Sequence, residues 1–566
     1  MARKKQLGEM LKESNLISEE QIQEALRTQK RSGGRLGQVL ISLGYVTEQD
    51  IINVLEFQLG IEQVDLNSVQ ITNDLLKFIP ENIIRQYKVL PLGKDGGTLK
   101  VAMADPLNIF AIDDIKVATG LEVQPVVTSE KDMDDYVDRL LGVEEIMNEE
   151  FQTGFEDDVD VSSPGIFDLS QGQQGAAEAP VVKLVNTIIN QAVNKKASDI
   201  HIEPREKKVI IRLRVDGILR DLTKVPKQIH PSLVSRVKIM AQMDIAEKRL
   251  PQDGRIQINI QKKSIDLRIS TLPTVFGEKV VMRILDKSQA LLGIDQLGFL
   301  PDNKKRFEDI IRSSYGIFLV TGPTGSGKTT TLYAALNEIS SPEKNIVTIE
   351  DPVEYVINDI NQTQVNTKSG YTFATGLRSI LRQDPDVIMV GEIRDGETAS
   401  IAARAATTGH MVLSTLHTND AAGAVARLID MGVEPYLVSS SVVGIVAQRL
   451  VRRICSKCSA SYQLDDKDPV HAFLGLAAGQ TMELFKGKGC GYCDNTGYKG
   501  RLAIHEVLIF NQKLRGMIVD PQGRDRLKVE AMAQGMKTLR MDGIEKARQG
   551  LTTIGEVMRV AYVDEG

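Results

Sequence analysis

The stretch Gly322-Pro-Thr-Gly-Ser-Gly-Lys-Thr329 decides how the second half of the chain folds. It matches the eight-residue phosphate-binding loop without deviation, follows an apolar run at 317–320 and opens a helical run at 330–339. Its glycines let backbone N–H groups turn toward phosphates, and the helix N-terminus favours an anion. Lys328 is expected to reach the β- and γ-phosphates of ATP, and the Thr329 hydroxyl to ligate Mg²⁺. The predicted nucleotide-binding residues are Gly322, Pro323, Thr324, Gly325, Ser326, Gly327, Lys328, Thr329 and Thr330.

Other apolar runs around this loop follow the order of a sheet covered by helices. Strand-like stretches cover residues 317–320, 345–349, 387–390 and 411–414, and helical stretches lie between them. Mostly parallel sheets are built in this order. We therefore predict an α/β fold for a C-terminal domain over residues 305–566.

Acidic residues follow two of these strands. Ile349-Glu-Asp-Pro-Val-Glu354 ends one strand with three carboxylates, and Gly391-Glu392 ends the next. In a P-loop fold, the strand that ends beside the phosphates supplies the acid that orients Mg²⁺ or water. Glu392 is the main candidate. The alternative, which applies more to Asp395 than to Glu392, is that such acids only cap a helix.

Two histidines flank the strand at 411–414. His417 follows that strand, so a role in sensing the γ-phosphate competes with the structural role that a lone histidine more often has. His410 precedes the strand, and we expect it to be structural.

The four cysteines form two CxxC pairs. Cys455 and Cys458 are separated by 31 residues from Cys490 and Cys493, and the chain has no other cysteine. In a cytoplasmic protein this pattern favours a metal over disulfides, and four thiolates suit a structural Zn²⁺. An iron–sulfur cluster is the alternative. We predict a zinc-binding insertion over residues 452–500.

The first 141 residues contain a repeat and a small domain. Leu7-Gly-Glu-Met-Leu11 recurs 29 residues later as Leu36-Gly-Gln-Val-Leu40, with helical spacing of apolar residues after each copy. Residues 1–60 are therefore predicted to be a tandem helical repeat. Residues 61–141 alternate strand-like and helical stretches and are predicted to form a small α/β domain.

A charged linker and a second folded part follow. Residues 142–180 are acidic and then rich in Ser, Gly, Gln and Pro, a composition that predicts a flexible linker. Residues 181–290 show strand alternation, for example at 209–216, and predict an antiparallel sheet with helices. Arg212 and Arg214 share one face of that strand, which is either functional or simply solvated.

Composition excludes several classes of protein. The net charge is -6, so nothing demands a nucleic-acid partner. No apolar run approaches the roughly 18–20 residues that cross a bilayer, and the longest, at 442–451, is interrupted by Gln448 and Arg449. The N-terminus lacks the apolar core of a secretory signal. We expect a soluble, cytoplasmic protein.

The motifs together resemble the secretion ATPase superfamily of type II secretion and type IV pili. Four stretches of sequence are similar to that family: residues 381–395, the acidic box at 350–354, the histidine box at 407–417, and Ser198-Asp-Ile-His-Ile-Glu-Pro204. The resemblance runs from about residue 181 to the C-terminus. It implies a RecA-like motor domain joined to a PAS-like α+β domain, with a mostly helical regulatory region before them.

The resemblance also implies roles for single residues. Glu392 and an acid of the acidic box, Glu350, would position the metal and the attacking water. Arg212 and Arg214 look like the arginines that this family turns toward the nucleotide, where they would stabilise phosphoryl charge. The cysteine insertion is similar to that of the assembly ATPases and is absent from pilus-retraction ATPases.

The N-terminal repeat resembles a tandem motif that binds cyclic di-GMP in some family members. The second copy fits, with Arg35 and Gly44 in place, whereas the first has Gln6 and Asn15 where the motif prefers arginine and glycine. An arginine would supply a bidentate guanidinium for a phosphate or a guanine edge. The alternative is a helical docking module for a membrane-platform or regulatory partner.

The resemblance leads to a hypothesis for the whole chain. We expect a homohexamer at the cytoplasmic face of the inner membrane, associated with the membrane only through partners, that hydrolyses ATP and drives a platform protein to assemble a pilus. The alternatives are a type II secretion ATPase and a nucleotide-gated scaffold without turnover. A DNA translocase is disfavoured by the net charge.

Overall fold

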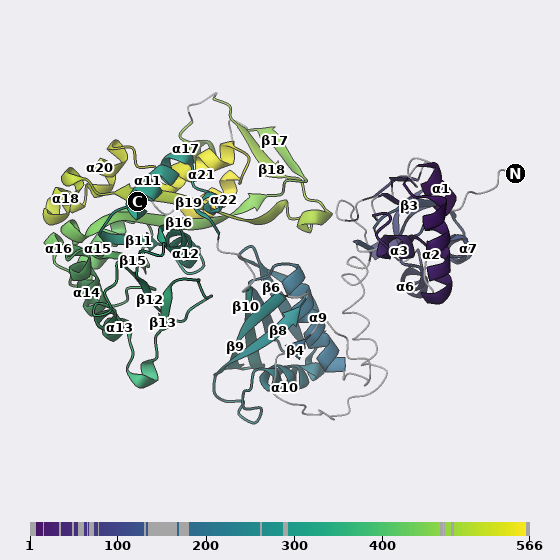
Figure 1. Cartoon of the computed structure of the whole chain (residues 1–566), viewed down its shortest axis with the longest axis horizontal. Helices are drawn as coiled ribbons and strands as arrows, with labels where there is room; N and C mark the ends of the chain where they lie inside the picture. The colour runs from purple at the N-terminus through teal and green to yellow at the C-terminus, as the bar shows by residue number, and fades with distance from the viewer. Residues whose placement is uncertain are drawn as a thin grey trace. The chain divides into compact units, whose positions relative to one another are not determined.

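The computed structural model (Figure 1) describes residues 7–561 except for a set of short and long gaps. The gaps are 15, 33–35, 48–49, 52, 55–60, 65, 67–72, 77, 130–131, 134–166, 169–179, 261–262, 287–291, 465–467, 469 and 477–479. The chain divides into two compact units. The first holds Met1–Val161, Ala176–Gln191 and Gly489–Thr496, and the second holds Ser162–Gly175, Ala192–Lys488 and Gly497–Gly566. Across the described part of the chain, every helix is too short or too polar to span a bilayer.

The repeat at the N-terminus forms short helices around one apolar core. The helices are α1 (Leu7–Glu13), α2 (Glu19–Ser32) and α3 (Leu36–Ser42). Met10 and Leu11 of the first copy are buried together with Val39 and Leu40 of the second. Gly44 ends the α3 turn with φ +74°, a left-handed conformation that glycine adopts without strain. Gln6, Asn15 and Arg35 lie outside the described residues.

A small α/β layer follows in the same unit. β1 (Val89–Asp95), β2 (Thr98–Met103) and β3 (Glu122–Val127) form a sheet in which β1 and β2 are antiparallel and β2 and β3 are parallel. The parallel pair needs a crossover, which α7 (Ile109–Thr119) supplies. α5 (Asn73–Leu76) and α6 (Glu81–Tyr87) complete this layer.

The predicted antiparallel sheet with helices forms the first part of the second unit. Its strand order is β4-β8-β9-β10-β5-β6-β7, antiparallel throughout apart from the short β4–β8 pair. The strands are β4 (Phe167–Asp168), β5 (Asp199–Pro204), β6 (Lys208–Val215), β7 (Ile218–Pro226), β8 (Gln252–Ile260), β9 (Lys263–Thr274) and β10 (Gly277–Asp286). α10 (His230–Met240) belongs to the same unit, whereas most of α9 (Pro180–Asn194) belongs to the first unit.

The alternation in residues 209–216 places one face of β6 in the core. Val209, Ile211 and Leu213 are buried, as their period of two predicts. Most of the predicted linker at 142–180 lies outside the described residues. Within it, Phe167 and Asp168 form β4 beside β8.

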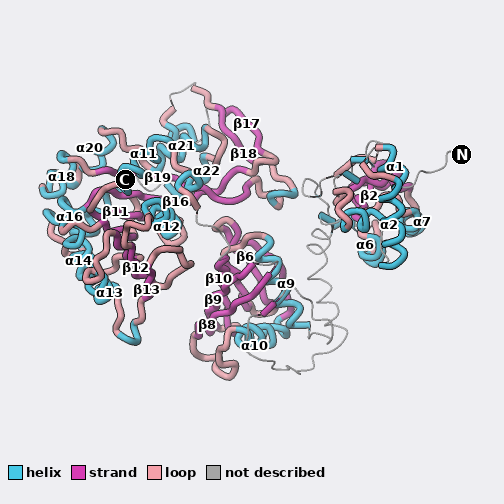
Figure 2. Tube along the Cα trace, viewed as in Figure 1, coloured by secondary structure: helices cyan, strands magenta, loops and turns pink. Residues whose placement is uncertain are grey.

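The predicted mostly parallel sheet is present in the C-terminal part, and Figure 2 draws its strands in magenta. Its strand order is β13-β12-β14-β15-β11-β16-β19. Only β16 and β19 run antiparallel to each other. The strands are β11 (Gly316–Thr321), β12 (Ile346–Glu350), β13 (Asn361–Gln364), β14 (Val387–Val390), β15 (Met411–Leu416), β16 (Val442–Ile454) and β19 (Tyr498–Ile509). The helices are α11 (Pro301–Ile311), α12 (Lys328–Ile339), α13 (Phe373–Ile380), α14 (Gly396–Thr407), α15 (Ala421–Asp430) and α16 (Pro435–Ser441).

Both faces of this sheet are covered. On β11, Ile317 and Leu319 join one apolar cluster, while Phe318 and Val320 join another. A parallel sheet buried on both faces explains why its strands are continuous apolar runs. The confirmed fold class is therefore α/β, with the phosphate-binding loop at the carboxyl end of a central strand.

The remaining elements follow or interrupt this sheet. α17 (Val470–Leu474) and the hairpin β17 (Ser459–Gln463) and β18 (Glu483–Gly487) lie between β16 and β19 in the chain. The helices α18 (Gln512–Val519), α19 (Pro521–Arg524), α20 (Leu527–Ala533), α21 (Leu539–Arg548) and α22 (Ile554–Ala561) end the described chain.

Candidate active site

The phosphate-binding loop joins β11 to α12 in a conformation that requires glycine. Gly325 and Gly327 have φ +77° and +89°, in the left-handed region. A Cβ on Gly322 would lie 2.5 Å from the Gln448 carbonyl oxygen and 2.6 Å from Ser326 Oγ. A side chain there would block the loop, so these glycines keep the backbone close enough to receive a phosphate.

A side-chain amide from β16 holds the loop in place. Gln448 is 3% exposed, and its Nε2 donates to the Ser326 carbonyl at 2.8 Å. Its Oε1 accepts from Thr331 Oγ1 at 2.7 Å. Both polar atoms of one buried amide therefore fix the start of α12.

Two polar groups of the loop are suited to phosphates. Ser326 Oγ is buried and, among the described residues, has no hydrogen-bond partner. Lys328 Nζ donates to the carbonyls of Gly322 at 2.9 Å and Pro323 at 3.1 Å. Burial lowers the pKa of Lys328, with Arg449 adding to the shift and Glu392 opposing it. A buried hydroxyl without a partner and a partly desolvated ammonium fit the phosphates of ATP, and the exposed Thr329 is free to meet Mg²⁺.

Glu392 lies at the end of β14 among charged groups. It forms an ion pair with Arg394, and its Oε2 lies 3.5 Å from His417 Nε2. Thr418, next to His417, donates its backbone N–H to Thr321 Oγ1 at the end of β11, at 2.9 Å. The structure thus brings Glu392 and His417 together beside the strand that leads into the phosphate loop.

Two residues near this edge have structural contacts. Asp395 caps α14, since its Oδ1 accepts from the Thr398 backbone N–H at 2.8 Å. His410 Nδ1 lies 2.9 Å from the Ala405 carbonyl oxygen. These contacts match the structural alternatives that the sequence left open for both residues.

Glu350 occupies a different environment from Glu392. It is 3% exposed at the end of β12, and its carboxylate accepts from Thr348 Oγ1 at 2.7 Å and Gln362 Nε2 at 3.0 Å. Tyr333, from α12, donates a third hydrogen bond. Every one of these donors is neutral.

The two candidate arginines lie on one face of β6 and pair with acids of β5. Arg212 Nη2 donates to both oxygens of Glu203, at 2.8 and 2.7 Å. Arg214 Nε lies 3.5 Å from Asp199 Oδ2. Among the described residues, neither arginine pairs with a residue of the phosphate loop, so the single chain does not bring them into the candidate site.

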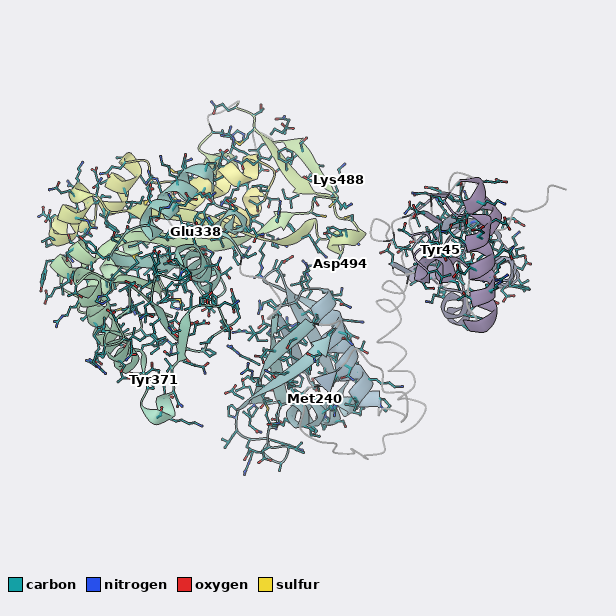
Figure 3. The ribbon with its side chains drawn as sticks, in the orientation of Figure 1. Tyr45, Met240, Glu338, Tyr371, Lys488 and Asp494 are labelled. Carbon is teal, nitrogen blue, oxygen red and sulfur yellow. The ribbon has the colours of Figure 1, made fainter. Side chains whose placement is uncertain are left out.

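The four cysteines meet in one cluster. Their Sγ atoms all lie within 4.8 Å of one another, and Cys490 Sγ and Cys493 Sγ are 3.7 Å apart. Tetrahedral zinc with Zn–S bonds of about 2.3 Å places its sulfurs about 3.8 Å apart. The donor set and its spacing therefore fit Zn²⁺, which Cys455, Cys458, Cys490 and Cys493 would hold. Lys488 and Asp494, labelled in Figure 3, flank the second pair in the chain.

Sequence reasoning missed several residues of the site. Gln448, Tyr333 and Gln362 act on the loop or on Glu350 from elements that are distant in sequence. Arg449 also belongs here, because its Nη2 donates to the Asn419 carbonyl at 3.0 Å, two residues after His417. The polar pair Gln448-Arg449 inside an otherwise apolar run was the available signal.

Comparisons with known proteins show the family of this chain. Residues 174–559 match the family described as type II/IV secretion system protein, and residues 59–147 match the MshEN domain. The type IV pilus assembly ATPase PilB of Myxococcus xanthus is 43% identical over 98% of both chains. The type II secretion system protein E of Dickeya dadantii is 44% identical over 86% of this chain and 98% of its own.

A solved structure supports the fold. The ATPase DotB of Legionella pneumophila superposes with a TM-score of 0.51 over 70% of this chain and 99% of its own, at 21% identity. This likeness extends to the fold alone. From the family match and the full-length relatives, the chain belongs to the type II/IV secretion system protein family.

Proposed function

We propose that the chain is a motor ATPase that drives type IV pilus assembly. The phosphate loop, with Glu392 and His417 beside the strand that leads into it, is the observation that carries ATP hydrolysis. Similarity at 43% identity along nearly the full length of a PilB carries the assignment to pilus assembly. The mechanical partner would be a platform protein at the cytoplasmic face of the inner membrane.

Each candidate residue has its own proposed role in ATP hydrolysis. Lys328 and the loop amides would bind the β- and γ-phosphates, and the Thr329 hydroxyl would hold Mg²⁺, which would supply charge neutralisation. Glu392 orients the attacking water, and its proximity to His417 gives that histidine a route to sense the γ-phosphate. Glu350 positions the water or the metal from the neighbouring strand.

The first test separates hydrolysis from binding. Glu392→Gln should remove most phosphate release and keep ATP affinity, because Lys328 and the loop amides remain. Glu397→Gln is the matched control, since it makes the same charge change at an exposed position in the first turn of α14. Steady-state phosphate release and nucleotide titration are measured on both. Normal turnover in Glu392→Gln contradicts the assignment, and a wild-type protein that binds ATP without turnover favours a nucleotide-gated scaffold.

A type II secretion ATPase is the second candidate, because relatives of that class reach similar identity. Both candidates share the hexameric ring, and we propose it here as well. The neighbouring genes discriminate them: pilin and platform genes support pilus assembly, and secretion genes support the alternative.

Zinc and cyclic di-GMP complete the proposal. The cysteine cluster would hold one structural Zn²⁺ per chain. Cyclic di-GMP would bind the N-terminal repeat, where the second copy keeps the favoured residues. Docking of a platform or regulatory partner on the same helices is the alternative.

A further inference from the structure

The Glu350 carboxylate is buried and depends on neutral donors. Thr348 and Gln362 donate to Oε1, and Tyr333 donates to Oε2. Among the described residues no Lys, Arg or His side chain forms an ion pair with Glu350. A buried carboxylate without a cation relies on each of its hydrogen bonds, because a lost donor leaves charge that water cannot reach.

Tyr333 connects this carboxylate to the phosphate loop. It lies on α12 four residues after Thr329, so the two side chains share one face of the helix, one turn apart. Thr348 and Gln362 donate from β12 and β13. Of the three donors, only Tyr333 belongs to the helix that the phosphate loop opens.

The surroundings keep the Tyr333 hydroxyl a donor. Tyr333 is fully buried, and the ring of Tyr355 packs edge-on against it with centroids 4.6 Å apart. Burial and the Glu350 charge raise the pKa of Tyr333. Burial, with the charges of Glu354 and Glu350, raises the pKa of Tyr355 to about 12. Both phenols therefore stay protonated near neutral pH.

We propose that Tyr333 is a positioning residue for hydrolysis, which fixes the Glu350 carboxylate relative to the phosphate-loop helix. This hydrogen bond would transmit any displacement of α12 to Glu350. This inference rests on the proposed ATP hydrolysis and deepens it, because it makes Glu350 act in a position set by the nucleotide-binding helix.

The experiment compares Tyr333 with Tyr355, whose rings pack against each other. Tyr333→Phe removes the hydroxyl that donates to Glu350. Tyr355→Phe removes a hydroxyl from the packed neighbour, which contacts this network through its backbone carbonyl and its ring. Phosphate release is measured against ATP concentration, with melting temperature and oligomeric state measured in parallel. Thr348→Val, which removes another donor at nearly constant volume, is a second test if Tyr333→Phe folds poorly.

The expected result is specific to Glu350. Tyr333→Phe should lower kcat about tenfold, less than the ~10²–10⁴-fold that removing a positioned base costs, and leave KM for ATP unchanged. The loss should fall on kcat, because the hydroxyl that is removed contacts Glu350. Thr348→Val should lower kcat in the same way, because it removes another donor to Glu350, and Tyr355→Phe should leave kcat and KM unchanged.

Three outcomes overturn the inference. The first is a Tyr333→Phe variant whose kcat equals that of the wild type. The second is an equal loss of kcat in Tyr333→Phe and Tyr355→Phe. The third is a Tyr333→Phe variant in which only KM changes. A wild-type protein without turnover instead contradicts the proposed function, so the two failures are told apart.

Discussion

Gln448 illustrates how a single side chain sets the geometry of the nucleotide site. Its amide spans the Ser326 carbonyl and the Thr331 hydroxyl, and a Cβ on Gly327 would lie only 2.8 Å from its Nε2. The motif at 322–329 predicted which residues bind phosphate, because those contacts are local in sequence. It could not predict the two hydrogen bonds of Gln448, because they depend on where β16 lies in the sheet.

The first prediction at this scale is that Gln448→Glu weakens nucleotide binding. Glutamate keeps an acceptor for Thr331 but turns an oxygen toward the Ser326 carbonyl, where Nε2 now donates. An unsatisfied buried group costs ~1–3 kcal/mol, or roughly 5- to 150-fold in affinity. A fluorescent-nucleotide titration measures it, with the exposed Gln522→Glu as the control for charge. Equal nucleotide affinities in the two variants would show that the hydrogen bonds of Gln448 do not determine the conformation of the phosphate loop.

At the scale of elements, β16 links the nucleotide site to the cysteine cluster. The strand covers Val442–Ile454, carries Gln448 in its middle and is followed directly by Cys455. Its apolar run was considered above only as a stretch too short to cross a bilayer, and no strand was predicted there, whereas the CxxC spacing predicted a four-sulfur site. That one element joins both was not predicted, since strand order in a sheet depends on packing between distant segments.

The prediction at this scale concerns metal removal. Cys490→Ser should abolish stoichiometric zinc and lower the melting temperature, because metal binding contributes directly to folding. Elemental analysis and thermal melting measure the two effects. Because Cys455 follows β16, we also expect faster amide exchange in 455–464 than in the wild type. Protein that melts normally without metal would refute a structural zinc, and stoichiometric iron would indicate a cluster instead.

At the scale of the whole molecule, the candidate catalytic residues lie in separate parts of the chain. Glu392 and His417 lie beside the phosphate loop, whereas Arg212 and Arg214 lie on the sheet of the preceding domain and pair with Glu203 and Asp199. Strand alternation predicted that the arginines share a face. It could not predict their acidic partners, because those come from β5 through the register Asp199↔Arg214.

The last prediction tests whether these arginines act on the nucleotide. The buried Nε of Arg212 has no hydrogen-bond partner among the described residues, so it is available to donate a hydrogen bond to a phosphate. If a neighbouring subunit or a domain movement brings the face to the nucleotide, Arg212→Ala and Arg214→Ala should slow hydrolysis strongly. Arginine fingers contribute about 10³–10⁵-fold, and a role shared by two arginines gives less for each.

The controls use arginines that pair with the same acids. Arg205 also pairs with Glu203, at 3.0 Å, and Arg283 pairs with Asp199, at 3.1 Å. Both are more exposed than Arg212 and Arg214, so alanine at these positions removes a similar charge without reaching the shared face of β6. Phosphate release, sedimentation and thermal melting are measured for all four variants. Slow hydrolysis in Arg212→Ala and Arg214→Ala alone, with normal assembly and melting, would place this domain in the active site. If all four variants hydrolyse ATP at the same rate, the arginines only neutralise Glu203 and Asp199. Removing any one of these four cations would then leave hydrolysis unaffected.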